Sequence, residues 1–339
     1  MSFFKKLFSK TNDSALPSKT EETATSHTAT NISEGDEEVP REQKQRMRNA
    51  ESLKFDGLRL LRAGYVTQAL EYLARSVELN PEFENRYYYA SALTRLGKNS
   101  EAIEIYKSLS QEAPEHTALH LSLLNLLVTE ERYAEASECF TKTSALSLDD
   151  AEEALLRFYE AMLAVGEEDY DRAIEAADRS LSLQADHPRV ALYKTKALLL
   201  ANRLEEAESW IKDMRQRFPE EERFALYAAT IAAERRQPEK EEKALKEAID
   251  IDPFNEEAHL RLAALYETQG HIEAAIALLS PFYEEEHATV RMKRCLADLY
   301  RKQDNPEKAD KVLESINEED IQQEGAEADF SSLYTNGLY

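Results

Sequence analysis

The sequence predicts an all-α protein in which pairs of short helices stack into a solenoid. Residues 57–81, GLRLLRAGYVTQALEYLARSVELNP, read as two short amphipathic helices separated by a tight turn at Gly64 and closed by a proline. The same pattern returns about one repeat later, in residues 89–114, YASALTRLGKNSEAIEIYKSLSQEAP. One such helix pair cannot bury its apolar face alone, so the fold needs copies of it.

Composition excludes several classes of function. The formal net charge of −24 opposes nucleic-acid binding, which depends on neutralising phosphates. The eight glycines form no G-x-G, which a dinucleotide-binding loop needs. Two cysteines, Cys139 and Cys295, are too few for a disulfide framework and suit a reducing cytosol. No apolar run is long enough for a transmembrane helix, so we expect a cytoplasmic protein.

Residues 1–48 form the first segment. They are rich in Ser, Thr, Glu and Lys and carry almost no large apolar residue after Phe8, so we expect this segment to be disordered. Its first ten residues differ, because Phe4, Leu7 and Phe8 share one helical face and three lysines accompany them. This short amphipathic start could attach the chain to a membrane surface, act as a docking helix, or be a frayed terminus.

Helical periodicity then runs from about Asn49 to about Ile316. An alanine lies early in each second helix of a pair, at spacings of 33, 34, 37, 34, 34, 34 and 34 residues when Glu241 fills one position. A small residue lies midway along most first helices, where it lets two helices approach closely. The alanines of the second helices are Ala69, Ala102, Ala136, Ala173, Ala207, Ala275 and Ala309, and the small residues are Gly57, Ala90, Ala161, Ala229, Ala263 and Ala297.

This period and these positions resemble the tetratricopeptide repeat, a 34-residue helix-turn-helix unit. The turn glycines and the closing prolines match as well; they are Gly64, Gly97, Gly270, Pro81, Pro114, Pro219 and Pro253. The resemblance covers about eight units over residues 49–316. It implies a right-handed α-α superhelical solenoid, with the first helices lining a concave groove. Pro238 and Pro306 depart from the pattern but are tolerated in the first turn of a helix.

The fourth unit carries three extra residues. GEEDY, residues 166–170, is longer than the GY turn of the first unit. We therefore expect a longer turn there, protruding or acting as a hinge.

A candidate binding site follows from the groove that the resemblance implies. Counted from the alanine positions, the groove combines basic residues with an apolar middle, which would attract acidic segments of partner proteins. The partner-binding candidates are Leu121, Asn125, Arg189, Lys196, Arg223, Arg291, Arg294, Arg301 and Lys302. His116 and His120 have the spacing of two metal ligands on one helix face, but no third ligand lies nearby in sequence. We expect no metal, no cofactor and no catalytic residue.

The predicted function is a non-enzymatic scaffold or adaptor that binds segments of other proteins in its groove, and these segments could be acidic. The alternative is a membrane-peripheral assembly factor anchored by residues 1–10. Residues 317–339 form an acidic tail that holds six Asp and Glu but no Lys or Arg. The tail either occupies the groove or merely caps the last repeat.

Overall fold

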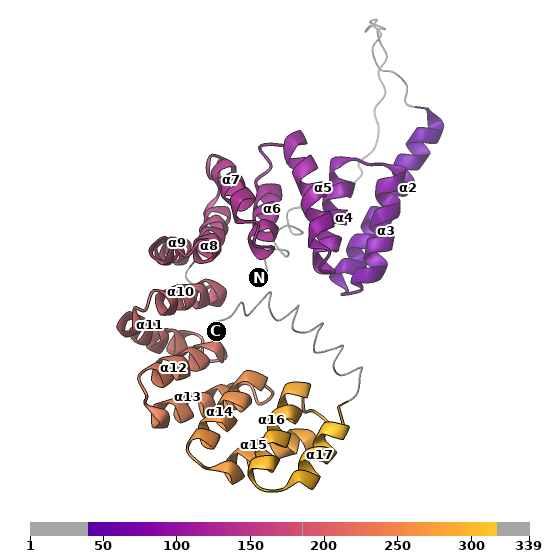
Figure 1. Cartoon of the computed structure of the whole chain (residues 1–339). Helices are drawn as coiled ribbons and strands as arrows, with labels where there is room; N and C mark the ends of the chain where they lie inside the picture. Colours follow the sequence, from indigo (N-terminus) through magenta and orange to yellow (C-terminus); the bar gives the residue numbers. More distant parts are fainter. Residues whose placement is uncertain (1–39, 185, 317–339) are drawn as a thin grey trace, which may run out of the picture. The chain divides into compact units, whose positions relative to one another are not determined.

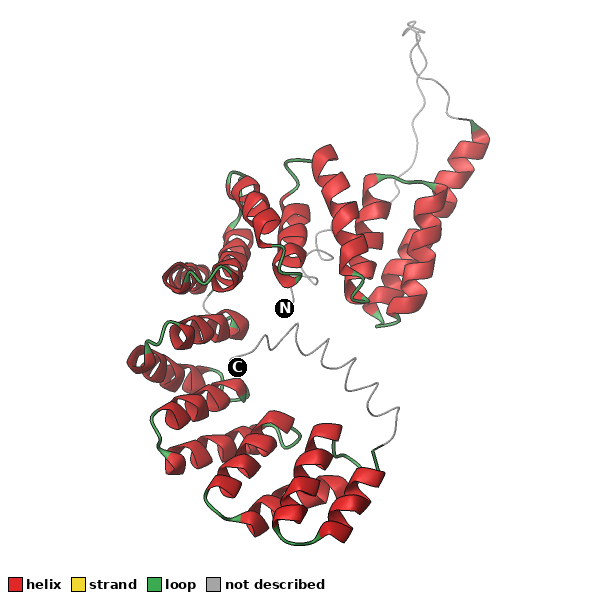
Figure 2. Ribbon diagram, viewed as in Figure 1, coloured by secondary structure: helices red, strands yellow, loops and turns green. Residues whose placement is uncertain are grey.

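In the computed structural model, which describes residues 40–184 and 186–316, all regular secondary structure is α-helical (Figures 1 and 2). The packing considered below lies within the compact unit that begins at Arg46. The sixteen helices of the described residues are α2 (Arg41–Arg62), α3 (Val66–Leu79), α4 (Phe83–Arg95), α5 (Asn99–Glu112), α6 (Thr117–Thr129), α7 (Tyr133–Ser144), α8 (Asp150–Gly166), α9 (Tyr170–Leu183), α10 (Pro188–Leu200), α11 (Leu204–Arg217), α12 (Arg223–Glu234), α13 (Pro238–Ile251), α14 (Glu256–Thr268), α15 (Ile272–Glu284), α16 (Val290–Lys302) and α17 (Pro306–Glu314).

The helices form eight stacked pairs, which confirms the predicted fold class. Neighbouring helices along the chain pack on one another. Successive even-numbered helices also make contact from α6 to α12, as do α14 and α16. We call the even-numbered member of each pair the first helix and the odd-numbered member the second helix. Each pair therefore covers the apolar face of the next pair.

Small residues lie where first and second helices approach most closely. The predicted alanines of the second helices are all buried, with 0–1% of their surface exposed. In the first helices Gly57 shows why a small residue is needed, because an added Cβ would lie 2.7 Å from Cγ of Leu73 in α3. Leu124 and Thr195, the two larger residues at this position, are also buried. The helix register read from these positions is therefore correct.

The turn inside each pair has one shape whether or not it contains glycine. One residue of the turn has positive φ: Gly64, Gly97 and Gly270 in three pairs, and Glu131, Glu168, Asn202, Arg236 and Asp304, at 53–60°, in the others. The next amide donates a hydrogen bond to the carbonyl five residues earlier, as from Tyr65 to Leu60 (3.0 Å) and from Gln237 to Ala232 (2.8 Å). This is the Schellman pattern, which ends a helix sharply. The prolines Pro238 and Pro306 begin the second helices that follow two of these turns, as predicted.

The expected start of the repeat region differs from the structure. Helix α2 begins at Arg41, eight residues before the predicted Asn49. Residues 41–48 are exposed and carry no apolar pattern, but Glu, Gln, Lys, Arg and Met all favour helix intrinsically. The rest of the N-terminal segment and residues 317–339 lie outside the described residues.

The longer turn predicted for the fourth unit is a wrong expectation. The three extra residues lengthen α8 instead, to 17 residues, whereas most other first helices have 12 or 13. Gly166 is the last residue of α8, and Glu168 takes the positive-φ position of a turn of ordinary length.

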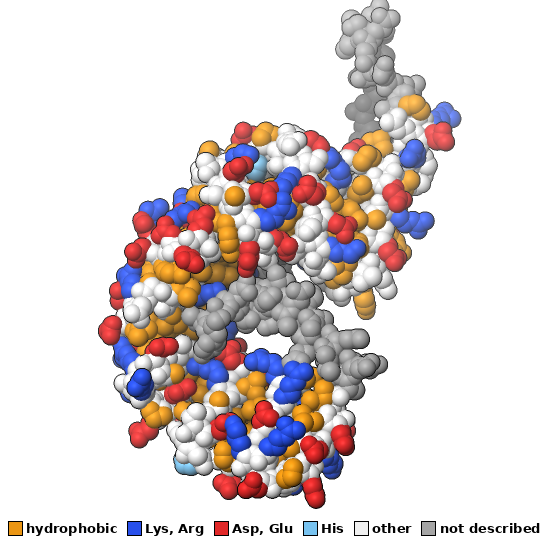
Figure 3. Space-filling view, viewed as in Figure 1, with side chains coloured by type: hydrophobic (Ala, Val, Ile, Leu, Met, Phe, Trp, Pro, Cys, Tyr) orange, Lys and Arg blue, Asp and Glu red, His pale blue; other side chains and the backbone are white. Residues whose placement is uncertain are grey.

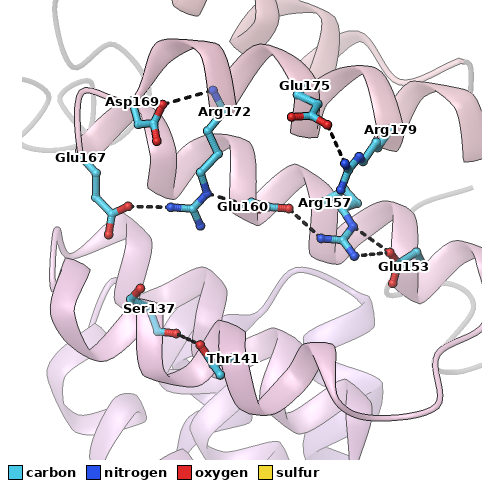
Figure 4. Close-up of polar contacts among 10 residues, drawn as sticks. All are labelled: Ser137, Thr141, Glu153, Arg157, Glu160, Glu167, Asp169, Arg172, Glu175 and Arg179. Carbon is cyan, nitrogen blue, oxygen red and sulfur yellow. Dashed lines mark hydrogen bonds and ion pairs between the residues drawn. The ribbon is translucent and has the colours of Figure 1, made fainter.

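A polar network joins α8 to its neighbours (Figure 4). Glu160 of α8, whose side chain is 12% exposed, accepts hydrogen bonds from Arg157 (2.8 Å) and from Arg172 of α9 (3.3 Å). Both guanidinium groups lie within 6 Å of the ring centre of Phe140 in α7, at 5.9 and 5.8 Å. The two arginines thus pack against an aromatic ring of the preceding unit and hold the longer α8 against α7 and α9.

Candidate functional site

Three consecutive first helices carry a tyrosine at the same position of the repeat. Tyr159 of α8, Tyr193 of α10 and Tyr227 of α12 are spaced 34 residues apart, and these helices pack on one another. Arg189 and Arg223 precede Tyr193 and Tyr227 by four residues, so each arginine shares a helix face with its tyrosine. We call these five residues the tyrosine–arginine surface. Tyr159 is buried, with 8% of its surface exposed, and is less accessible than the other four residues.

A different face of α10 is covered by second helices. Lys194 Nζ forms an ion pair with Asp178 of α9 (2.6 Å) and lies 4.0 Å from the ring centre of Trp210 in α11. The Trp210 indole N–H donates to the carbonyl oxygen of Ala191 at 3.3 Å. Tyr193 lies next to Lys194 in sequence, about 100° around the helix, and is only half-buried. The tyrosine–arginine surface is therefore separate from the face that packs on the second helices.

The positive charges of the two arginines act on the hydroxyl groups of the three tyrosines. Burial is the main influence on all three tyrosines and raises their pKa values, that of Tyr227 to about 12. The charge of Arg189 acts on Tyr159 and Tyr193 and lowers their pKa, and the charge of Arg223 does the same for Tyr193 and Tyr227. The phenols therefore stay protonated at neutral pH, and those of the partly buried Tyr193 and Tyr227 can donate hydrogen bonds to a bound carboxylate or carbonyl.

The two arginines differ in what they bind. The Arg223 Nε and Nη2 atoms contact both carboxylate oxygens of Glu221, at 2.6 and 3.0 Å. The guanidinium of Arg189 instead lies over the ring of Phe158, 5.3 Å from its centre. It forms no ion pair with any residue that the structure describes, and its side chain is exposed. Arg189 thus presents a guanidinium held by an aromatic ring and open to a bidentate carboxylate.

Lys196 adds a third positive charge to α10. It is half-buried, and burial lowers the pKa of its ammonium group, while the carboxylate of Glu131 opposes that shift. Of the two predicted candidates on α6, Asn125 is half-buried, whereas Leu121 has none of its surface exposed. Leu121 is therefore a core residue and is not accessible to a partner, which corrects the prediction.

The four predicted candidates lie on α16 and form a separate group at the last pair. Figure 3 shows where Lys and Arg side chains gather on one face of the molecule. Three of the four candidates are already in ion pairs. Arg291 contacts Glu256 (3.4 Å), Arg301 contacts Asp298 (3.8 Å) and Asp310 (3.6 Å), and Lys302 contacts Glu267. Arg294 is exposed. The predicted basic groove is thus two groups of residues, of which the one on α10 and α12 offers the more available charge.

Sequence comparison now gives the family. Two models described as tetratricopeptide repeat match the chain, one over residues 57–117 and the other over residues 164–230. The chain is a tetratricopeptide repeat protein. The second match contains all of α10 and the first eight residues of α12, and the stretch between the matches contains most of the lengthened α8. The candidate site thus lies largely on regular repeats of the family.

Solved structures agree with this tetratricopeptide fold. PilW, described as a widely conserved type IV pilus biogenesis factor, shares 16% identity with a TM-score of 0.54, covering 66% of this chain and 100% of PilW. PilF of Pseudomonas aeruginosa shares 18% identity with a TM-score of 0.51, covering 62% of this chain and 94% of PilF. Among curated protein sequences, none matches the chain significantly. At these identities the likeness concerns the fold alone.

Sequence reasoning missed the tyrosines. Tyr159 lies in the fourth unit, whose three extra residues obscure the register, and Tyr193 and Tyr227 carry no formal charge, so counting charges did not select them. A signal existed, because Tyr159, Tyr193 and Tyr227 recur at the 34-residue period of the repeat.

The two histidines singled out by their spacing have structural roles. His116 caps the N-terminus of α6 by accepting a hydrogen bond from the Leu119 amide, and His120 Nε2 lies 2.9 Å from the carbonyl oxygen of Pro114. Within residues 40–184 and 186–316, no group of three or more His, Cys, Asp or Glu side chains is arranged to hold a metal. Over the same ranges, no helix combines the length and apolar character needed to cross a membrane. Residues 1–10, named above as an alternative anchor, lie outside them.

Proposed function

We propose that this tetratricopeptide repeat protein is a non-enzymatic scaffold that binds an extended, acidic segment of a partner protein on its tyrosine–arginine surface. Proteins of this family mediate protein–protein interactions, and the finer proposal concerns which surface does so and what it recognises. We also place the chain in the cytoplasm, because Cys139 and Cys295 are both free thiols, as a reducing compartment keeps them.

The observation that carries this proposal is the open guanidinium of Arg189. The chain has a net charge of −24, and many of its arginines are bound to carboxylates of neighbouring helices. Arg189 is held in place by Phe158 instead, which leaves its hydrogen-bond donors available. Because the guanidinium is already positioned, a carboxylate of a partner would bind it without the entropy cost of ordering a mobile side chain.

The tyrosines supply the second part of the recognition. Partly buried aromatic side chains beside arginine are the residue types that contribute most to binding at protein interfaces. Tyr193 and Tyr227 each offer a ring for apolar contact and a protonated hydroxyl for a hydrogen bond. Their spacing by one repeat suits an extended segment that runs across α10 and α12 and alternates acidic with apolar or aromatic side chains.

A random peptide library displayed on phage tests the proposal with the full chain as target. We expect the selected peptides to share at least one Asp or Glu near an aromatic or large apolar residue. Binding of a synthetic selected peptide, measured by fluorescence anisotropy, should weaken at least about tenfold in Arg189→Glu, because an attraction becomes a repulsion. Tyr193→Ala should weaken it as well.

Arg75→Glu is the matched control, since Arg75 is an exposed arginine on the second helix α3 of the first pair. It makes the same change in net charge and should leave the affinity nearly unchanged. Selected peptides without acidic residues, or peptides whose affinity falls equally in Arg75→Glu and Arg189→Glu, would contradict the proposed site.

A further inference from the structure

We propose that residues 317–339 of this chain bind to the tyrosine–arginine surface. They would then compete with a partner protein for that surface. This inference rests on the proposed function, because it uses the same surface. It concerns regulation, since a partner would have to displace the segment before it could bind.

The chemistry of the segment matches the surface. It contains six carboxylates and no basic residue, together with three aromatic residues in its second half. The carboxylates are Glu318, Glu319, Asp320, Glu324, Glu327 and Asp329, and the aromatic residues are Phe330, Tyr334 and Tyr339. Asp329-Phe330 in particular joins a carboxylate to an aromatic ring, the combination that Arg189 and Tyr193 are placed to bind.

The segment is long enough to reach α10. It follows Ile316, two residues after the end of α17 in the last pair. The first helices α14 and α12 lie between α16 and α10 in the order of the repeats, and three steps of the usual interaxial distance amount to about 30 Å. Asp329 lies thirteen residues after Ile316, and thirteen residue steps in extended conformation span about 43 Å. The Asp329-Phe330 pair can therefore lie on α10.

The α16 group is nearer in sequence but is less suited as the main contact. Arg291, Arg301 and Lys302 already contact carboxylates of α14, α16 and α17. A tail carboxylate there would have to replace an existing partner, and the net gain would be small. Arg189 has no such competitor within the described residues.

Covalent attachment makes even a weak contact effective. A tethered segment of this length acts at an effective concentration of about 1 mM, so contacts of millimolar affinity already populate the bound state. A free partner would then bind with reduced apparent affinity, by the fraction of molecules in which the surface is open.

Energy transfer from Trp210 tests this proposal in the full chain. Trp210 is the single tryptophan and packs behind α10, where its indole N–H donates to the carbonyl oxygen of Ala191. A dansyl group on Ser332→Cys, in a chain that also carries Cys295→Ser, places an acceptor three residues after Asp329. Cys139 can stay, because it is buried and burial raises the pKa of its thiol to about 11.

Transfer from Trp210 to the dansyl group should be well above its value in urea-unfolded chain. It should fall in Arg189→Glu and with added salt, because screening weakens a contact between exposed charges. Arg75→Glu should leave it unchanged. Equal transfer in the parent chain and in Arg189→Glu would overturn the proposal.

A second measurement separates this proposal from the proposed function. The affinity of a library-selected peptide should rise about twofold or more when Glu324→Gln, Glu327→Gln and Asp329→Asn weaken the tail, because the competitor is removed. If Arg189→Glu weakens peptide binding but the tail substitutions leave the affinity unchanged, the proposed function stands and the tail proposal fails. If the library yields no ligand while transfer still depends on Arg189, the tail proposal stands and the partner proposal fails.

Discussion

Gly64 has a backbone conformation that residues with a side chain adopt only with strain. Its φ is +87°, and a Cβ added there would meet no atom within 4 Å. Gly64→Ala should therefore cost about 1 kcal/mol through the backbone alone. Urea denaturation followed by circular dichroism measures this loss.

Arg236→Gly is the reciprocal change, at the same position of another turn. Arg236 has a φ of 53°, so glycine there relieves backbone strain in the folded state but raises the conformational entropy of the unfolded chain. Because the two effects oppose each other, the free energy of unfolding should stay the same or rise slightly. A larger loss in Arg236→Gly than in Gly64→Ala would mean that the turns are not equivalent.

Glu241 occupies the position where other second helices have a buried alanine. It is partly buried, and burial raises the pKa of its carboxyl group, with the charge of Arg261 opposing. A raised pKa in the folded state means that stability falls as pH rises from the ordinary value of a glutamate through the raised one. Glu241→Ala should thus be more stable than the parent at neutral pH, and the difference should shrink in acid.

Thermal melts of Glu241→Ala and the parent at pH 4 and pH 7 test this expectation. A stability difference that is larger in acid than at neutral pH would show that burial does not raise the pKa of this carboxyl group.

For single residues, the sequence predicted the position of a residue in the repeat better than the contacts of its side chain. The period identified Ala69 and its equivalents as core, because one small residue per unit is required wherever two helices approach. It also placed Leu121 on the groove face, but whether that position is open depends on the neighbouring helix, which sequence spacing does not report. Ion pairs such as Arg291 with Glu256 join residues 35 apart and depend on side-chain geometry in the same way.

At the scale of single helices, α8 depends on the Glu160 network (Figure 4). Glu160→Ala would leave Arg157 and Arg172 with less charge compensation beside Phe140, and the free energy of unfolding should fall by about 1–3 kcal/mol. Glu175→Ala is the control, because its pair with Arg179 is more than half exposed and should contribute about 0–0.5 kcal/mol. Urea denaturation of both variants gives the comparison, and equal losses would show that the network does not fix α8.

The extra residues of α8 show why element boundaries were harder to predict than element number. An insertion of three residues can lengthen a turn or add most of one helical turn, and the apolar pattern allows both. The structure adds them to α8, where Leu163 and Ala164 are buried and Glu168 can still adopt positive φ. Helix α2 extends N-terminally for a related reason, since residues with high helix propensity continue a helix without burying an apolar side chain.

At the scale of the whole molecule, stability should be a sum of local terms, because each pair contacts mainly its neighbours. Ala309 of α17 has none of its surface exposed, so Ala309→Arg should unfold the last pair. Hydrogen exchange should then lose protection in α16 and α17 but keep it in α4 to α10. Uniform loss of protection along the chain would contradict a repeat architecture with local cooperativity.

The central claim is that Arg189 binds a carboxylate of a protein segment, and a charge swap between the two tests it most directly. For a library-selected peptide, the affinities of the original peptide and of a peptide with its acidic residue changed to Lys are measured against the parent chain and against Arg189→Glu. Each single change should weaken binding, and the two together should restore much of it, because the attraction is re-formed with reversed signs. Losses that simply add in the doubly changed pair would show that Arg189 and the carboxylate do not meet, and would contradict the account.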